Sequence, residues 1–208
     1  MSDKFRPWTE YPSLTQRRLS DIAELIRISR HEAVLLHDPT AGDNEWSLGC
    51  RVYARTCNSL RSAAKDRKWL TILHEDEKPL RFTFAIGSIP IKFYRGGAGD
   101  PPSHYLNVPA AELQQQQLAF KIDGISLVDH LLRLAVATDA SREVSSVVLV
   151  KIDMAGNVFD TYRIAFPDEH ENVGPLRPKP VDLGPPPLEP RHEEAEAKKH
   201  KDRNASSQ

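Results

Sequence analysis

The stretch FTFAIGSIPIKFY, residues 82–94, decides the class of fold. On both sides of its central Gly-Ser pair, apolar residues recur at every second position, as they do in strands with a buried face. Gly87 has no Cβ and supplies the positive φ of a type II′ turn, so the pattern predicts an antiparallel β-hairpin. Pro90 has no N–H to donate, which predicts either an edge strand or a position that faces outward.

Three further strands are predicted around this hairpin. A short apolar run at residues 69–73 precedes it. Residues 147–152 are nearly all apolar, as in a strand buried on both faces, and residues 158–166 carry apolar side chains on one face. Together these segments predict a mainly antiparallel five-stranded sheet.

Two long helices are predicted before the sheet. Ser13 is the expected N-cap of the first, whose apolar stripe is Leu19, Ile22, Ile26, Ala33 and Leu36. Asp43 or Asn44 caps the second, whose stripe is Trp46, Gly49, Cys50, Tyr53, Cys57, Leu60 and Ala64. The short connection at residues 38–43 predicts an antiparallel helix pair. An alternative makes residues 31–37 a short strand.

Two more helices are predicted between the strands. Pro109 suits the first turn of a helix that runs to Phe120, and Ser126 with Asp129 resembles a capping box for a helix ending near Thr138. Helices and strands thus come in runs rather than in strict alternation. That order predicts an α+β fold, with the N-terminal helix pair and with helices on one face of the sheet.

The composition divides the chain at residue 167. All 15 aromatic residues precede this point, whereas half of the 16 prolines follow it. A segment without aromatic residues buries too little surface to offset the entropy of ordering it. The sequence therefore predicts an extended arm at 1–12, one α+β domain at 13–166, and a disordered tail at 167–208 that is first Pro-rich and then charged.

Charge and cysteine content restrict the class of protein. The formal net charge is −1, so no global field attracts membranes or nucleic acids. The first residues contain no apolar targeting segment, and no apolar run approaches the ~20 residues of a membrane helix. Cys50 and Cys57, seven residues apart on one helix, have Cα atoms too far apart for a disulfide. A cytoplasmic location with two free thiols is predicted.

The sequence contains no pattern that specifies a reaction. His31 and His37 are six residues apart, so they do not share a helix face as zinc ligands with i, i+4 spacing do. No Gly-x-Ser-x-Gly nucleophile motif occurs, and both cysteines fall on the packed stripe. No catalytic residue, metal site or cofactor is predicted, and binding is favoured over catalysis.

Two groups of residues are candidates for binding. The first is the polar face of the second helix, whose cations are able to contact the phosphates of a nucleic acid: Arg51, Arg55, Arg61 and Lys65. The second is a Gly- and Pro-rich loop after the hairpin, where hydrogen-bonding groups collect for a small ligand or a partner: Lys92, Tyr94, Arg95, His104 and Tyr105.

Three functional hypotheses follow. The leading one is a non-catalytic cytosolic interaction or regulatory protein that binds a protein partner and uses its tail to dock or tether. The first alternative is a nucleic-acid-associated protein that uses the basic face of the helix at 44–65. The second alternative is a small-ligand-binding protein or enzyme with its site near the loop at 92–105.

Overall fold

The computed structural model describes residues 5–74, 82–125 and 130–167 of the chain. The predicted hairpin is confirmed: β2 (Thr83–Ile86) and β3 (Ile89–Arg95) pair antiparallel, and Gly87 between them has a φ of 62°. β3 also pairs with β4 (Leu131–Thr138), so it is not the edge strand that Pro90 suggested. The pairing with β4 begins only at Ile91, so no hydrogen bond to β4 requires a backbone N–H at Pro90.

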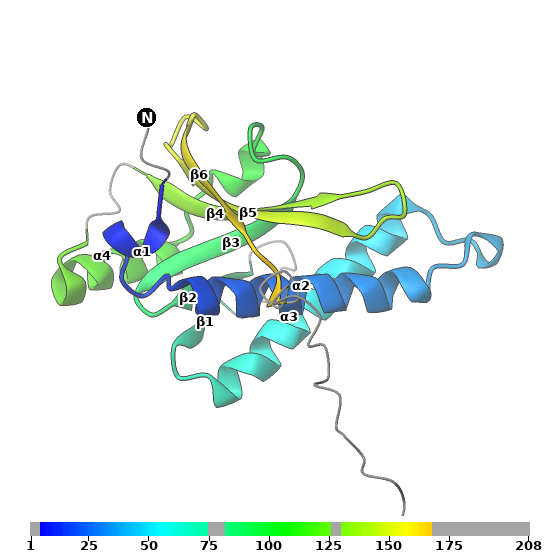
Figure 1. Cartoon of the computed structure of the whole chain (residues 1–208), viewed down its shortest axis with the longest axis horizontal. Coiled ribbons are helices and arrows are strands. Elements are labelled where there is room, and N and C mark those ends of the chain that lie inside the picture. Colours follow the sequence, from blue (N-terminus) through cyan, green and yellow to red (C-terminus); the bar gives the residue numbers. More distant parts are fainter. Residues whose placement is uncertain (1–4, 75–81, 126–129, 168–208) are drawn as a thin grey trace, which may run out of the picture. The chain divides into compact units, whose positions relative to one another are not determined.

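The strands form one sheet in the order β1-β2-β3-β4-β5-β6 (Figure 1). β1 (Leu70–His74) is one edge strand, and β6 (Val158–Ile164) is the other, paired with β5 (Val144–Ile152). Neighbouring strands are antiparallel except for β3 and β4, which are parallel. The α+β class and the mainly antiparallel sheet are confirmed, with six strands where five were predicted.

The additional strand is β4, which the sequence analysis assigned to a helix. Six of its eight residues are buried, because the strand lies inside the sheet and both of its faces are covered. A strand buried on both faces has a continuous run of apolar residues in its sequence. Such a run also contains the apolar spacing of a helix. The expected helix start at Ser126 and Asp129 lies outside the described residues.

The N-terminal helix pair is confirmed as α2 (Gln16–Leu35) and α3 (Glu45–Asp66), joined by the short 3-10 helix η1 (Pro39–Ala41). The single long helix is confirmed as far as Leu35, and the alternative of a short strand at residues 31–37 is wrong. Asn44 caps α3 by accepting from the backbone N–H of Trp46 and Ser47, whereas Thr15 rather than Ser13 caps α2. Side-chain caps of this kind satisfy N–H groups that the first helical turn leaves free.

Burial follows the predicted stripes except near the connection between the helices. In α2 the stripe residues up to Ala33 are buried, and in α3 Cys57 and Leu60 are buried. Leu36 and Trp46 are 56% and 76% exposed. Figure 1 shows that the loop end of the pair extends past the strands, so the sheet does not cover these two side chains.

The two faces of the sheet are covered differently. α2 contacts β5 and β6, and α3 contacts β1, so the helix pair covers one face as predicted. Successive side chains of a strand point to opposite faces, and on the other face the loop after β3 packs against Tyr94 and Ala135. The helix α4 (Ala110–Asp123) contacts both sides: its Glu112 reaches side chains of β3 and β4 on that face, whereas its Ala119 belongs to the core that the helix pair covers. The predicted packing of helices on one face is formed mainly by α2 and α3.

The N-terminal segment contains one helical turn, α1 (Pro7–Glu10), where an extended arm was expected. Trp8 packs edge-on against Tyr162 of β6 at 5.3 Å between ring centroids. Of the predicted tail, only Pro167 lies within the described residues. Among the helices of the described ranges, none combines the length and apolar character needed to span a bilayer.

Replacing Gly87 with Ala is expected to lower the free energy of unfolding by about 1–3 kcal/mol. The new Cβ would lie 2.5 Å from the Cβ of Ser13, and the backbone there has a positive φ. Gly49→Ala is the matched control, because its Cβ would meet no atom within 4 Å and α3 would gain helix propensity. Urea unfolding measures both variants, and equal stability of the two would contradict this account of the turn.

Candidate functional site

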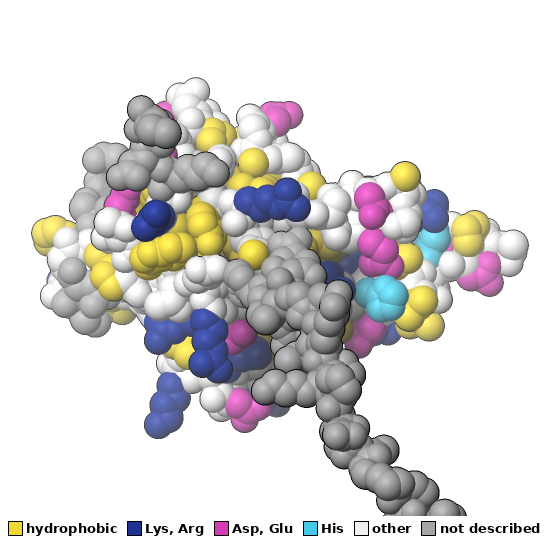
Figure 2. All heavy atoms as spheres, in the orientation of Figure 1, with side chains coloured by type: hydrophobic (Ala, Val, Ile, Leu, Met, Phe, Trp, Pro, Cys, Tyr) yellow, Lys and Arg dark blue, Asp and Glu magenta, His cyan; other side chains and the backbone are white. Residues whose placement is uncertain are grey.

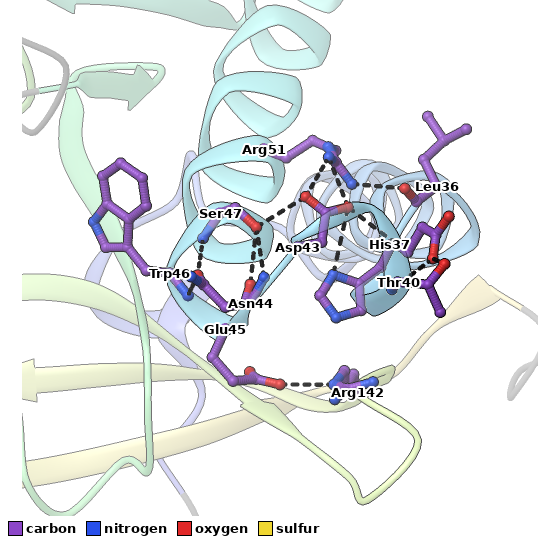
Figure 3. Close-up of polar contacts among 11 residues, drawn as sticks. Leu36, His37, Thr40, Asp43, Asn44, Glu45, Trp46, Ser47, Arg51 and Arg142 are labelled. Atoms are coloured by element: carbon purple, nitrogen blue, oxygen red, sulfur yellow. Dashed lines mark hydrogen bonds and ion pairs between the residues drawn. The ribbon is translucent and has the colours of Figure 1, made fainter.

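The four cations predicted on α3 fall into two pairs with different surroundings. Arg51 places Nη2 3.1 Å from both carboxylate oxygens of Asp43 and donates from Nη1 to the carbonyl oxygen of Leu36 at 2.9 Å (Figure 3). Arg55 lies 2.9 Å from Glu32 of α2. These two guanidinium groups therefore join α3 to α2 and to the connecting loop, and their charges are compensated by acids.

Asp43 is the centre of this polar cluster at the loop end of the helix pair. Its carboxylate accepts from the backbone N–H of Asp38 at 3.0 Å and from the hydroxyl of Ser47 at 3.0 Å. The backbone N–H of Asp38, more than Arg51, holds the pKa of Asp43 below its usual range. His37 lies 3.8 Å from the same carboxylate. The cluster holds the connection between α2 and α3 in place. Arg51 therefore has a structural role.

Arg61 and Lys65 instead line an open groove of about 620 Å³ between the C-terminal half of α3 and the edge strand β1. We call it the basic groove, and its lining residues are Asn58, Arg61, Ser62, Ala64, Lys65, Lys68, Leu70, Thr71 and Ile72. Among these described residues, three are cations and none is an acid. The structure thus brings Arg61 and Lys65 together with Lys68, which sequence reasoning had not selected.

The helical repeat and the turn after α3 produce this arrangement. Arg61 and Lys65 are four residues apart, which places them on one face about 6 Å apart along the helix axis. Lys68 follows in the turn that leads into β1. Lys65 and Lys68 are exposed, whereas Arg61 is half-buried with its guanidinium 5.1 Å from the ring centroid of Phe82. Arg61 therefore has a packing role as well as a charge in the groove.

More positive charge lies beside the basic groove. Arg18 and Arg67 stand over the ring of Trp69, at 5.5 Å and 5.9 Å from its centroid. Figure 2 shows Lys and Arg side chains gathered at the lower edge of the molecule, where Figure 1 places the start of α2, the end of α3 and β1. The acid Asp66 lines a neighbouring cavity between α2 and α3, and Asp21 lies 3.9 Å from Arg67. Among the described residues at and beside the basic groove, cations therefore outnumber acids.

The predicted loop site does not come together as one open site. Tyr94 is 1% exposed and donates from its hydroxyl to the carbonyl oxygen of Gly97 at 3.2 Å. Its ring packs on Tyr105 at 5.4 Å, and Tyr105 packs on His104 at 4.3 Å. Burial raises the pKa of Tyr94 to about 12 and also raises the pKa of Tyr105. Three of the five candidates thus form a packed layer over the sheet.

The two cations of that loop prediction lie on opposite faces of the sheet, because Lys92 shares the face of Tyr94 whereas Arg95 points to the other. Arg95 lies at the surface, 3.5 Å from Glu45, which also pairs with Arg142 at 2.7 Å. Lys92 is 6% exposed and donates to the carbonyl oxygen of Asn107 at 2.6 Å. Both groups have partners within the fold, so the five residues do not share a cavity wall.

Lys92 belongs to a buried ion cluster that the sequence analysis missed. Glu112 of α4 lies 3.0 Å from Lys92 and 2.7 Å from Arg133 of β4, and neither Glu112 nor Arg133 is exposed. Arg133 also donates to the carbonyl oxygen of Tyr105 at 2.9 Å. Burial lowers the pKa of Arg133, and Glu112 opposes that shift. A single Arg inside an otherwise apolar run was the available signal.

The two cysteines differ in their chemistry. The prediction that both lie on the packed stripe is wrong for Cys50, which is exposed. Cys57 is buried, and burial raises the pKa of its thiol to about 12. Because the thiolate is the reactive form, iodoacetamide at about pH 8 is expected to modify Cys50 and to reach Cys57 only in urea. Mass spectrometry of tryptic peptides measures this. Equal labelling of both thiols in the folded chain would contradict the packing of α3 against the sheet.

His31 of α2 and His37, which follows the helix, each contact one carboxylate. His31 lies 3.0 Å from Glu143, and His37 lies 3.8 Å from Asp43. Within residues 5–74, 82–125 and 130–167, no three His, Cys, Asp or Glu side chains are placed to hold a metal ion. Comparisons of the chain with models of protein families, with curated proteins and with solved structures found no match.

Proposed function

We propose that the chain is a non-catalytic interaction protein that binds an acidic macromolecule through the basic groove. The observation that carries the proposal is the lining of the groove, which holds Arg61, Lys65 and Lys68 and, among its described residues, no acid. Elsewhere on α3 the cations are compensated, as Arg51 is by Asp43 and Arg55 by Glu32. A local excess of one charge favours a partner of the opposite charge even when the net charge is near zero.

The side chains that catalysis would need as nucleophiles, acids or bases are packed or paired, and this favours binding over catalysis. The phenols of Tyr94 and Tyr105 are packed together with raised pKa values, and the thiol of Cys57 is buried and protonated. Lys92 is engaged by Glu112 and by the carbonyl oxygen of Asn107. The groups of the basic groove are cations and neutral donors, which bind anions without reacting with them.

Heparin–agarose chromatography of the full chain tests the proposal, because heparin is a polyanion with no sequence to recognise. The chain is expected to be retained at low salt and to elute in a salt gradient. Lys65→Glu with Lys68→Glu removes two exposed cations of the groove and is expected to abolish retention. The matched control is Arg6→Glu with Arg163→Glu, two exposed cations near the opposite edge strand β6.

Both double variants lower the net charge by the same amount. A difference in heparin retention between them therefore depends on where the substituted cations lie and not on the total charge. Retention of the control with loss of the groove variant supports the proposal. Failure of the unaltered chain to bind, or equal losses in the two variants, would reject it. Thermal unfolding of each variant verifies that the fold is retained.

A further inference from the structure

We propose that the acidic partner of the basic groove is a nucleic acid, held by the phosphates of one strand. This inference rests on the proposed function and specifies the partner of the same site. Its basis is the match between a linear array of cations and a linear array of phosphates. Arg61 and Lys65 follow one another along α3, and Lys68 continues the row into the turn before β1.

The individual groups suit phosphate. A guanidinium such as that of Arg61 presents a planar fork of donors that pairs with two phosphate oxygens, and an ammonium acts as a mobile point charge. The groove also offers the neutral side chains of Asn58, Ser62 and Thr71, all of which are exposed. Hydroxyl and amide side chains, together with Lys and Arg, make most protein contacts to the phosphate–sugar backbone.

The rest of the lining fits a strand better than it fits an acidic protein. Tight protein interfaces centre on large apolar or aromatic anchors that enter pockets. The apolar members of the lining are Ala64 and Ile72, both half-buried, and Leu70, which is 3% exposed. They provide a shallow floor for sugars and base faces rather than a deep pocket. Arg18 and Arg67 beside Trp69 extend the positive surface next to the groove.

The structure also changes which residues of α3 the nucleic-acid hypothesis uses. Of the four cations predicted from the sequence, Arg51 and Arg55 are held by Asp43 and Glu32, so a phosphate would have to displace a carboxylate. Within the described residues no carboxylate pairs with Arg61 or Lys65, and both lie with Lys68 in the groove. The predicted contact surface is therefore the C-terminal half of α3 with the start of β1.

Fluorescence anisotropy of the full chain with a labelled oligothymidylate of about 20 nucleotides tests this inference. Three cations that displace counterions from a single strand give a slope of log K against log salt of about −2. Raising NaCl from about 50 to about 200 mM is then expected to weaken binding about 20-fold. Lys65→Glu with Lys68→Glu should weaken binding by about tenfold or more and flatten the slope by about 1.4, which leaves the contribution of Arg61.

Three comparisons make the result decisive. The control Arg6→Glu with Arg163→Glu is expected to keep both affinity and slope. A labelled duplex of the same length tests whether paired strands are also accepted, and groove-dependent binding of either form supports the inference. Labelled polyglutamate represents an acidic protein. If it binds through the groove and the oligonucleotides do not, the inference fails while the proposed function stands; if no polyanion binds, both fail.

Discussion

Glu112→Gln is expected to lower the free energy of unfolding by about 3–5 kcal/mol. Glu112 is the carboxylate that faces two cations in the interior, 3.0 Å from Lys92 and 2.7 Å from Arg133. All three side chains are buried. The neutral amide would remove the carboxylate that faces Arg133 and Lys92, in surroundings where an uncompensated charge is strongly unfavourable. Urea denaturation at neutral pH measures the change.

The matched control is Glu32→Gln, which removes the partner of Arg55 on the surface. The side chain of Glu32 is 53% exposed, so the expected loss is below about 1 kcal/mol. Similar losses for the two variants would show that the interior cluster does not depend on charge pairing. A variant with apolar residues at all three interior positions is expected to recover most of the stability, because no charge would then be buried.

Phe84→Ala is expected to cost about 3–5 kcal/mol of unfolding free energy. Phe84 is fully buried on β2, its ring lies 6.3 Å from that of Phe82, and its backbone partners are Ile72 and Ile91. Truncation removes apolar contacts and leaves a cavity between the sheet and the helix pair. The same substitution at Phe159 of β6, which is 61% exposed, is expected to cost far less. Equal costs in thermal unfolding would contradict the assignment of the core to the face covered by α2 and α3.

The parts of the fold that could be predicted are those where one local pattern has one structural solution. Gly87 between two alternating runs allows a hairpin and little else, and Asn44 before the Trp46 stripe begins a helix. β4 could not be identified in this way, because a strand buried on both faces and a buried helix have the same apolar sequence. Only the pairing of β4 with β3 and β5 distinguishes them, and that pairing is a long-range property.

For the candidate site, the positions of the cations along α3 could be predicted, but their partners could not. Helical spacing correctly placed Arg51, Arg55, Arg61 and Lys65 along α3, but spacing carries no information on what stands opposite each cation. Asp43 and Glu32 meet the first two only after α2 and α3 have packed. Lys68 joins the other two because the chain turns into β1. Likewise, the sequence analysis assigned Lys92 to the candidate loop site, and only the fold shows that Glu112 lies against it.

The measurement that tests the central claim most directly is an NMR titration of the ¹⁵N-labelled full chain with oligothymidylate. The account predicts that the amide shifts cluster in the C-terminal half of α3 and at the start of β1, at Asn58, Ser62, Lys65, Lys68 and Thr71. Shifts confined to the Arg51–Arg55 half of α3 or to the loop around Tyr94 and Tyr105 would contradict it. So would a saturable complex that leaves the amides of the basic groove unchanged.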